Sequence, residues 1–302
     1  ALERYGEAFQ SFVEGNRLLR AAIDTTAPPA KEILPDVKAH LGENYQGVIQ
    51  TSSSQGEAPV FLLGFQQSGH QILTALLRGV KEAALVEHSS IFSALRLRLS
   101  AQGFVPSGAL QALAGKELDE LRAHYHGALK TLGAESGKIL IQANPANFYE
   151  LPLILRMFPR SRIIFAGAHP LDTCLHCFVK DFVPGRAARI YSDLNDAAAF
   201  MADSVRLWEK FKAEMSFAFL EVRVENLFED TEAVFDRVLD FIREESPYPF
   251  TVGARGIDRL HEIVLDQKTL SPPGRWKHYR EYLTGIAGTL REACRQGGYE
   301  SP

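Results

Sequence analysis

The chain has 302 residues, of which 46% are hydrophobic and 23% are charged, so it carries enough apolar side chains for a large globular core. Its formal net charge of −4 gives no overall attraction to nucleic acid or to an anionic membrane, and we expect neither as a partner. No apolar run approaches the roughly 18 residues that span a bilayer, and no signal peptide is visible, which predicts a soluble cytoplasmic protein.

The first 57 residues differ in pattern from the rest of the chain. Residues 1–25 predict a helix, because apolar side chains recur on one face. Residues 26–57 contain several prolines and the polar run TSSSQG, which predict loops on both sides of a short helix. We therefore expect a helical N-terminal segment and linker over residues 1–57 and an α/β domain over residues 58–302.

The stretch PVFLLGFQQSGHQILTALL, residues 59–77, has the pattern of a strand, a tight loop and a helix. Val60 to Leu63 form an apolar run, and Gly64, Ser68 and Gly69 lie in the loop before apolar residues at helical spacing. Such a loop directs backbone N–H groups and the positive end of a helix dipole at one point, which suits a phosphate or sulfate. It is not a Walker A sequence, because it lacks the Gly-Lys-Ser/Thr ending and contains no lysine or arginine.

Strands and helices are predicted to alternate through the remainder of the chain. This alternation implies right-handed crossovers and a central parallel sheet with helices on both faces, with a ligand crevice at the carboxyl ends of the strands. The further predicted strands are residues 138–141, 162–166 and 217–224, and the predicted helices are residues 89–100, 115–132, 147–158, 196–215 and 231–243, with one more that begins at Pro170.

Three cysteines, Cys174, Cys177 and Cys294, are too few and too uneven in number for a disulfide framework. The segment CLHC has the spacing of a redox or zinc pair, but no second pair of cysteines or histidines lies near it in the sequence. It falls in a predicted helix, where ordinary packing explains buried cysteines. We predict no metal site.

Four segments, in order along the chain, resemble the sulfotransferase family. PVFLLGFQQSGHQ resembles its first phosphosulfate loop, RIIFAGAHPLDTCLHCF its 3′-phosphate segment, VRVENLFED the strand and helix cap that follow, and GRWKHY its closing donor segment. The closest likeness is to bacterial sulfotransferases fused behind tetratricopeptide repeats, and FVEGNR resembles the helix that joins those parts.

The resemblance implies a fold similar to that of P-loop nucleotide kinases. It also implies transfer of a sulfuryl group from 3′-phosphoadenosine 5′-phosphosulfate (PAPS) to a hydroxyl or amine. The acceptor would be a small molecule, a carbohydrate or a peptide. Such chemistry needs cations and backbone donors around the transferring group, and a base for the acceptor proton.

The sequence departs from the family where that charge is needed. The family's first loop usually reads Pro-Arg-Ser-Gly-Thr-Thr, whereas this chain has Gln66 followed by the residues to which the resemblance assigns donor contacts, namely Gln67, Ser68, Gly69, His70 and Gln71.

The family's 3′-phosphate arginine and serine correspond to Ala168 and His176, and the resemblance leaves Arg275 and Lys277 as the expected cationic donor contacts. A charged phosphate hydrogen bond contributes about 1.5–3 kcal/mol, so the loss of several cations would weaken donor binding by orders of magnitude. Replacement cations could come from Arg186 and Arg189, which we predict in a flexible loop.

Glu87 and His88 are candidate general bases, because the family often carries a glutamate before a helix in this segment. The alternative interpretation is an ordinary loop carboxylate beside a surface histidine.

His70, His169 and His176 are expected to converge on the crevice if the fold is correct. Neutral imidazoles would bind a dianion better near pH 6 than at pH 7, or could ligate a metal. The competing interpretation is neutral drift in a site that is no longer used.

Three functions therefore stay open from the sequence: a sulfotransferase that uses PAPS, a non-catalytic binding or scaffold domain with a possible protein partner, and a transferase with another anionic ligand. Arguments from the site outweigh fold analogy where the two conflict.

Overall fold

The computed structural model describes residues 3–25, 37–49, 58–101, 107–134, 138–244 and 273–301. These residues contain a five-stranded, all-parallel sheet with strand order β2-β3-β1-β4-β5. The predicted α/β class with a central parallel sheet is therefore confirmed. The strands are β1 (Val60–Gly64), β2 (Ala83–Glu87), β3 (Ile139–Ala143), β4 (Arg162–Gly167) and β5 (Ala218–Arg223).

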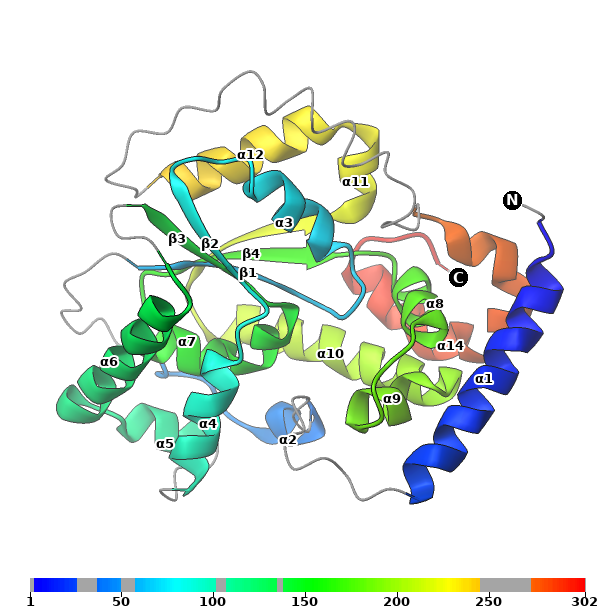
Figure 1. Ribbon diagram of the computed structural model, residues 1–302, viewed down its shortest axis with the longest axis horizontal. Helices are drawn as coiled ribbons and strands as arrows, with labels where there is room; N and C mark the ends of the chain where they lie inside the picture. The colour runs from blue at the N-terminus through cyan, green and yellow to red at the C-terminus, as the bar shows by residue number, and fades with distance from the viewer. Residues whose placement is uncertain are drawn as a thin grey trace.

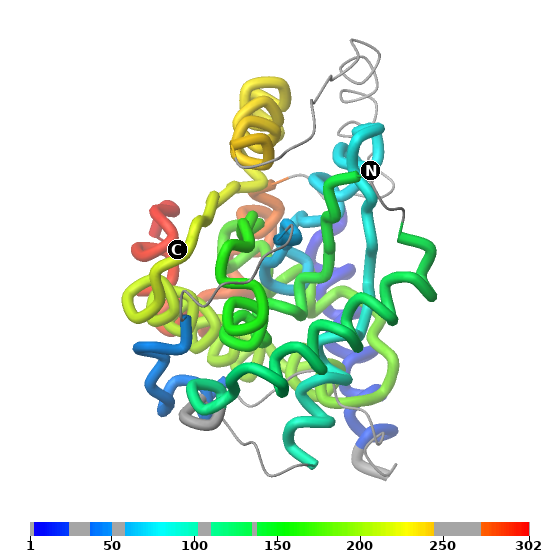
Figure 2. Tube along the Cα trace, turned by 90° about the vertical axis from the view of Figure 1, so that its left-hand side faces the viewer, coloured from blue at the N-terminus to red at the C-terminus, as the bar shows by residue number. Residues whose placement is uncertain are grey.

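Helices cover both faces of the sheet (Figure 1). One face carries α3 (His70–Leu77), α11 (Val224–Glu229) and α12 (Thr231–Arg243). The other face carries a thicker layer, and Figure 2 shows the same division from the side, with α12 on one side of the strands and α6 and α10 on the other. The thicker layer contains α4 (Ile91–Ala101), α6 (Gly115–Thr131), α7 (Leu151–Met157), α8 (Pro170–Val179), α10 (Leu194–Glu214) and α14 (Arg280–Gln296).

The apolar run of β1 is buried on both sides because it lies in the middle of this sheet. Val60 and Leu62 belong to the core beneath α3 and α12, whereas Phe61 and Leu63 belong to the larger core on the opposite face. Because successive side chains of a strand point to opposite faces, β1 contributes to both hydrophobic cores.

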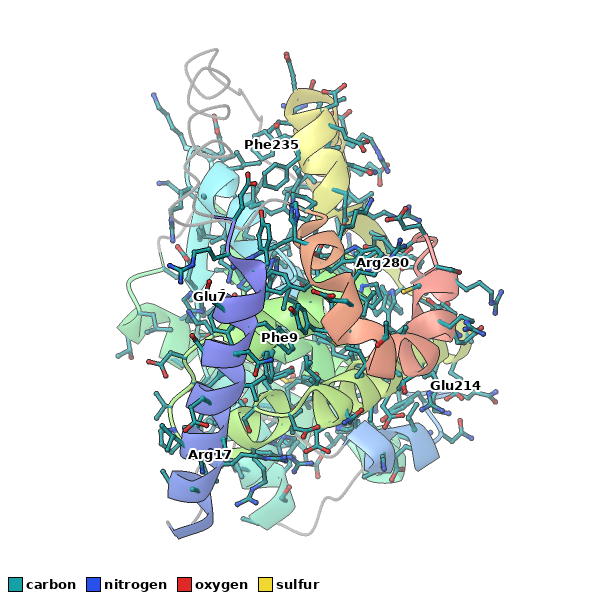
Figure 3. The ribbon with its side chains drawn as sticks, turned by 90° about the vertical axis from the view of Figure 1, so that its right-hand side faces the viewer. Glu7, Phe9, Arg17, Glu214, Phe235 and Arg280 are labelled. Atoms are coloured by element: carbon teal, nitrogen blue, oxygen red, sulfur yellow. The ribbon has the colours of Figure 1, made fainter. Side chains whose placement is uncertain are left out.

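The N-terminal helix α1 (Tyr5–Thr25) packs on the thicker layer. Phe9, labelled in Figure 3, stacks on Tyr282 with ring centroids 4.5 Å apart and on Phe178 at 5.8 Å. The buried amide of Asn16 donates to the Phe178 carbonyl oxygen at 2.7 Å. The division at residue 57 stays a prediction, and the expected loops over residues 26–36 and 50–57 lie outside the described residues.

The remaining elements are short connections. They are α2 (Val37–Gly42), α5 (Ser107–Ala112), α9 (Arg186–Tyr191) and the 3-10 turns η1 (Pro145–Glu150) and η2 (Arg275–Tyr279).

No helix in the described ranges is long and apolar enough to cross a membrane.

One strand was not predicted, and one local expectation was wrong. Strand β2 was not predicted, because it is a five-residue edge strand that contains two alanines and buries only alternate residues. Arg186 and Arg189 lie on the helix α9 and not in a flexible loop. Burial of Ala188 and Tyr191 on one face of α9 stabilises this short helix.

Candidate active site

The loop between β1 and α3 fits closely against its neighbours because a glycine lies at each end of it, Gly64 as the last residue of β1 and Gly69 just before α3. A Cβ atom at Gly64 would lie 2.4 Å from the Ala166 carbonyl oxygen. Gly69 has φ of +81°, and a Cβ atom there would lie 2.3 Å from Cγ2 of Val224. The two glycines therefore let the loop lie between β4 and α11, with the start of α3 at the carboxyl ends of the strands.

Ser68 connects this loop to β4 through hydrogen bonds. Its hydroxyl is fully buried, 2.7 Å from the Phe65 carbonyl oxygen and 2.9 Å from that of Ala166. Its backbone N–H also donates to the Phe65 carbonyl. The polar hydrogens of Ser68 are therefore used by the loop and by β4.

A cavity of about 630 Å³ opens at this end of the sheet, where the parallel topology predicts the crevice. Most of the residues proposed from the sequence line it, whereas Ser68, His169, Arg275 and Lys277 are not among its lining residues. The lining residues are Gln67, Gly69, His70, Gln71, Ile72, Thr74, Ala75, Arg78, Glu87, His88, Ala143, Ala168, Asp172, His176, Val179, Lys180, Val224 and Pro273.

Glu87, the candidate base at the end of β2, is held in an ion pair across the cavity wall. The Arg78 guanidinium donates two hydrogen bonds to its carboxylate, at 2.7 and 2.6 Å. His88 follows with φ of +49° and an exposed side chain, and its backbone N–H donates to Ala143. Arg78 was not recognised from the sequence, because residues nine apart on a helix and the next strand meet only after folding.

His70 and His176 flank the loop as neutral imidazoles. Burial, together with the charge of nearby His88, lowers the pKa of His70 to about 4, and burial next to Arg275 lowers the pKa of His176 to about 4. The His176 ring is hydrogen-bonded to the Gln67 carbonyl. Both rings are therefore neutral at pH 6 as well as at pH 7, which contradicts the expectation that mild acid would charge them.

His169 does not converge with the other two histidines. Its Nδ1 atom accepts a hydrogen bond from the Leu171 N–H at 3.2 Å, which caps α8. Its ring stacks on Trp276, and its Nε2 atom lies 3.1 Å from the Glu300 carbonyl oxygen. No group of three or more potential ligands occurs among the described residues, so the metal hypothesis for the three histidines has no support there.

Asp172 holds the start of η2 beside α8. Its carboxylate accepts hydrogen bonds from the N–H groups of Gly274 at 2.6 Å and Trp276 at 2.7 Å. Burial raises the pKa of Asp172 to about 6, against the opposing effect of these two donors. The predicted helix that begins at Pro170 places Asp172 in its first turn, but no local signal indicates this contact over about a hundred residues.

Arg275 and Lys277 lie on η2, the turn whose first N–H groups are bound by Asp172. Lys277 forms an ion pair with Glu300 at 2.7 Å, and the Arg275 guanidinium carbon lies 5.9 Å from the centre of the Tyr279 ring. The segment proposed as the closing donor contact is therefore attached to α8 and to the C-terminal residues.

Comparisons with known proteins agree with this architecture. The model of a family described as "Sulfotransferase family" matches residues 59–247. Sulfotransferase STF9 from Mycobacterium avium is 13% identical, with a TM-score of 0.51 over 87% of this chain and 82% of that one. The sulfotransferase domain of the Synechococcus PCC 7002 olefin synthase is 14% identical, with a TM-score of 0.50 over 84% of this chain and 99% of that one. At these identities the likeness concerns the fold.

A protein of Aquifex aeolicus is similar to this chain in sequence. An uncharacterized protein of Aquifex aeolicus (strain VF5) is 21% identical over 322 residues, which cover 97% of this chain. The chain spans 40% of that protein's length.

Proposed function

Because the chain belongs to the sulfotransferase family, we propose that it keeps the ligand crevice of the sulfotransferase fold but binds its ligand without transferring a sulfuryl group from PAPS. The observation that carries the proposal is the balance of charge at the crevice. Among the described lining residues, the cations are Arg78 and Lys180 and the carboxylates are Glu87 and Asp172, so positive and negative side chains are equal in number. The two lining histidines that are buried stay neutral.

A polyanionic donor would gain little from Arg78. Arg78 could reach a phosphate or sulfate only by leaving Glu87, and the unpaired carboxylate would then repel the same anion. Backbone N–H groups at the start of α3 provide partial positive charge, worth about 0.3–1 kcal/mol when exposed. The N–H groups can also hydrogen-bond an anion, but they do not replace the charge of the loop arginine, whose hydrogen bonds to phosphate contribute about 1.5–3 kcal/mol each.

Calorimetric titration with 3′-phosphoadenosine 5′-phosphate (PAP), the stable product of PAPS, tests the proposal. We expect no micromolar binding to the unaltered protein at pH 6 or at pH 7.5. In the Gln67→Arg variant, which restores the family's loop arginine at a cavity-lining position, we expect PAP affinity to rise by at least about tenfold.

The matched control is Gln46→Arg, which adds the same charge at an exposed position outside the cavity lining. It should leave PAP binding unchanged. Micromolar binding of PAP to the unaltered protein would overturn the proposal, because it would mean that other cations hold the donor.

An active sulfotransferase is the second candidate. It is favoured by the start of α3 at the cavity and by Arg275, which lies close enough to His176 to lower the pKa of that ring. In that case Glu87→Gln and Arg275→Ala should each abolish transfer of radiolabelled sulfate from PAPS to a panel of alcohols and amines. The melting temperature of Glu87→Gln should change little, since its pair with Arg78 is partly exposed and exposed ion pairs contribute about 0–1 kcal/mol.

A further inference from the structure

The polar groups around the loop share one chemical property. Gln67 and Gln71 have amide side chains, and His70 and His176 are neutral imidazoles. Each of these four groups has a hydrogen-bond donor and an acceptor, and the donor of His176 is used by the Gln67 carbonyl. A phosphate or sulfate only accepts from such a group, and an ammonium only donates to it.

Two of these groups have ring nitrogens without a hydrogen-bond partner in the part of the chain that the structure describes. His70 is only 4% exposed, and neither of its ring nitrogens has a partner there. His176 is fixed on one side by the Gln67 carbonyl, which leaves its buried Nε2 atom without a partner there. Buried polar atoms are normally hydrogen-bonded, and each unsatisfied one is destabilising, so an external polar group at these rings would be favourable.

Apolar side chains complete the wall between the polar groups. Ile72 and Ala75 come from α3, Val179 comes from the end of α8, and Val224 begins α11. A ligand in this cavity therefore meets apolar surface along its body and donor–acceptor groups at its polar atoms. A volume of about 630 Å³ is within the usual range for small-molecule sites.

We propose that the crevice binds a neutral, hydroxyl-rich ligand of the polyol or carbohydrate class, with ligand hydroxyls hydrogen-bonded to His70 and His176 beside the loop. A hydroxyl both donates and accepts, so it satisfies either nitrogen of a neutral imidazole. This inference rests on the proposed function, because it fills the crevice with an uncharged ligand in place of the donor.

Histidine-selective ¹⁵N NMR tests the inference directly. The probes are glycerol and D-glucose, with sodium sulfate at the same concentration as the anionic comparison. We expect saturable shifts of the His70 and His176 ring nitrogens with at least one of the two neutral probes, and none with sulfate. Glycerol is small enough to enter without a specific fit, so the absence of a saturable shift with both probes overturns the inference.

Variants distinguish ligand binding at the crevice from a nonspecific effect of the probe on the protein. Gln71→Ala changes an exposed residue of the first turn of α3, so it should fold, and it should weaken the neutral probe severalfold. His70→Phe should weaken it by about tenfold, as measured at His176. His124→Phe, at an exposed position outside the crevice, should leave the titration unchanged.

The two proposals fail in different ways. Sulfate shifts larger than those of the neutral probes, or unaltered glucose binding in both crevice variants, would overturn the inference about the ligand. Micromolar PAP binding in calorimetry would instead overturn the proposed function itself.

Discussion

Position 69 requires glycine for two reasons. Its backbone is left-handed, with φ of +81°, and its Cα atom faces Val224 of α11. We expect Gly69→Ala to destabilise the protein by more than the roughly 1–2 kcal/mol of the backbone term, because the new Cβ atom would also displace Val224. Urea unfolding measures the change.

Gly285→Ala is the control for that variant. Gly285 lies within α14, and a Cβ atom there would meet no atom of the described residues within 4 Å apart from its own helix backbone and chain neighbours. Alanine at this position should stabilise the protein by roughly 0.5–1 kcal/mol. Equal effects of the two substitutions would contradict the close fit of the loop.

The neutral state of His70 makes stability depend on pH. The folded protein holds the pKa of His70 at about 4, below the value of 6.5 for an unperturbed imidazole, so the unfolded chain binds more protons between these values. The contribution of His70 to stability is therefore present above pH 6.5 and is lost as the pH falls toward 4. Between pH 7 and pH 5 we expect the contribution of His70 to the free energy of unfolding to fall by about 2 kcal/mol.

The His70→Phe variant removes this titration and should show a shallower loss of stability over the same range. Urea unfolding of both proteins at pH 7 and pH 5 gives the comparison. Parallel pH profiles would mean that the imidazole is hydrated in the folded protein.

At the scale of elements, α1 belongs to the same hydrophobic core as the sheet helices. Phe9→Ala removes a ring that stacks on Phe178 and Tyr282, and it should cost about 3–5 kcal/mol. Val13→Ala, at a position 40% exposed on the same helix, should cost less than about 1 kcal/mol. A Phe9→Ala variant that unfolds like the unaltered protein would support an independent N-terminal segment.

Elements were predictable where a long apolar pattern specifies them. The run at β1 and the amphipathic pattern of α10 identify a central strand and a covering helix without any knowledge of their partners. Edge strand β2 was missed because its alanine-rich pattern depends on pairing with β3. Its last residue, Glu87, was proposed as a base, but its pairing with Arg78 could not be predicted.

At the scale of the whole molecule, the strand order brings the loop after β1, the end of β2 and the start of α8 to one edge of the sheet. This convergence was predictable, since it follows from parallel strands alone. The use of individual side chains within it was not. Asp172 and His169 connect α8 to residues more than a hundred positions away, and such contacts leave no local pattern in the sequence.

The central claim is that the crevice is balanced in charge and holds no phosphosulfate donor. A crystal structure determined from protein crystals soaked in PAP tests this claim most directly. The account predicts no nucleotide at the start of α3 and an intact pair of Arg78 with Glu87. Phosphate groups of PAP bound to the N–H groups of Gly69 to Gln71, with Arg78 turned from Glu87 toward them, would contradict it.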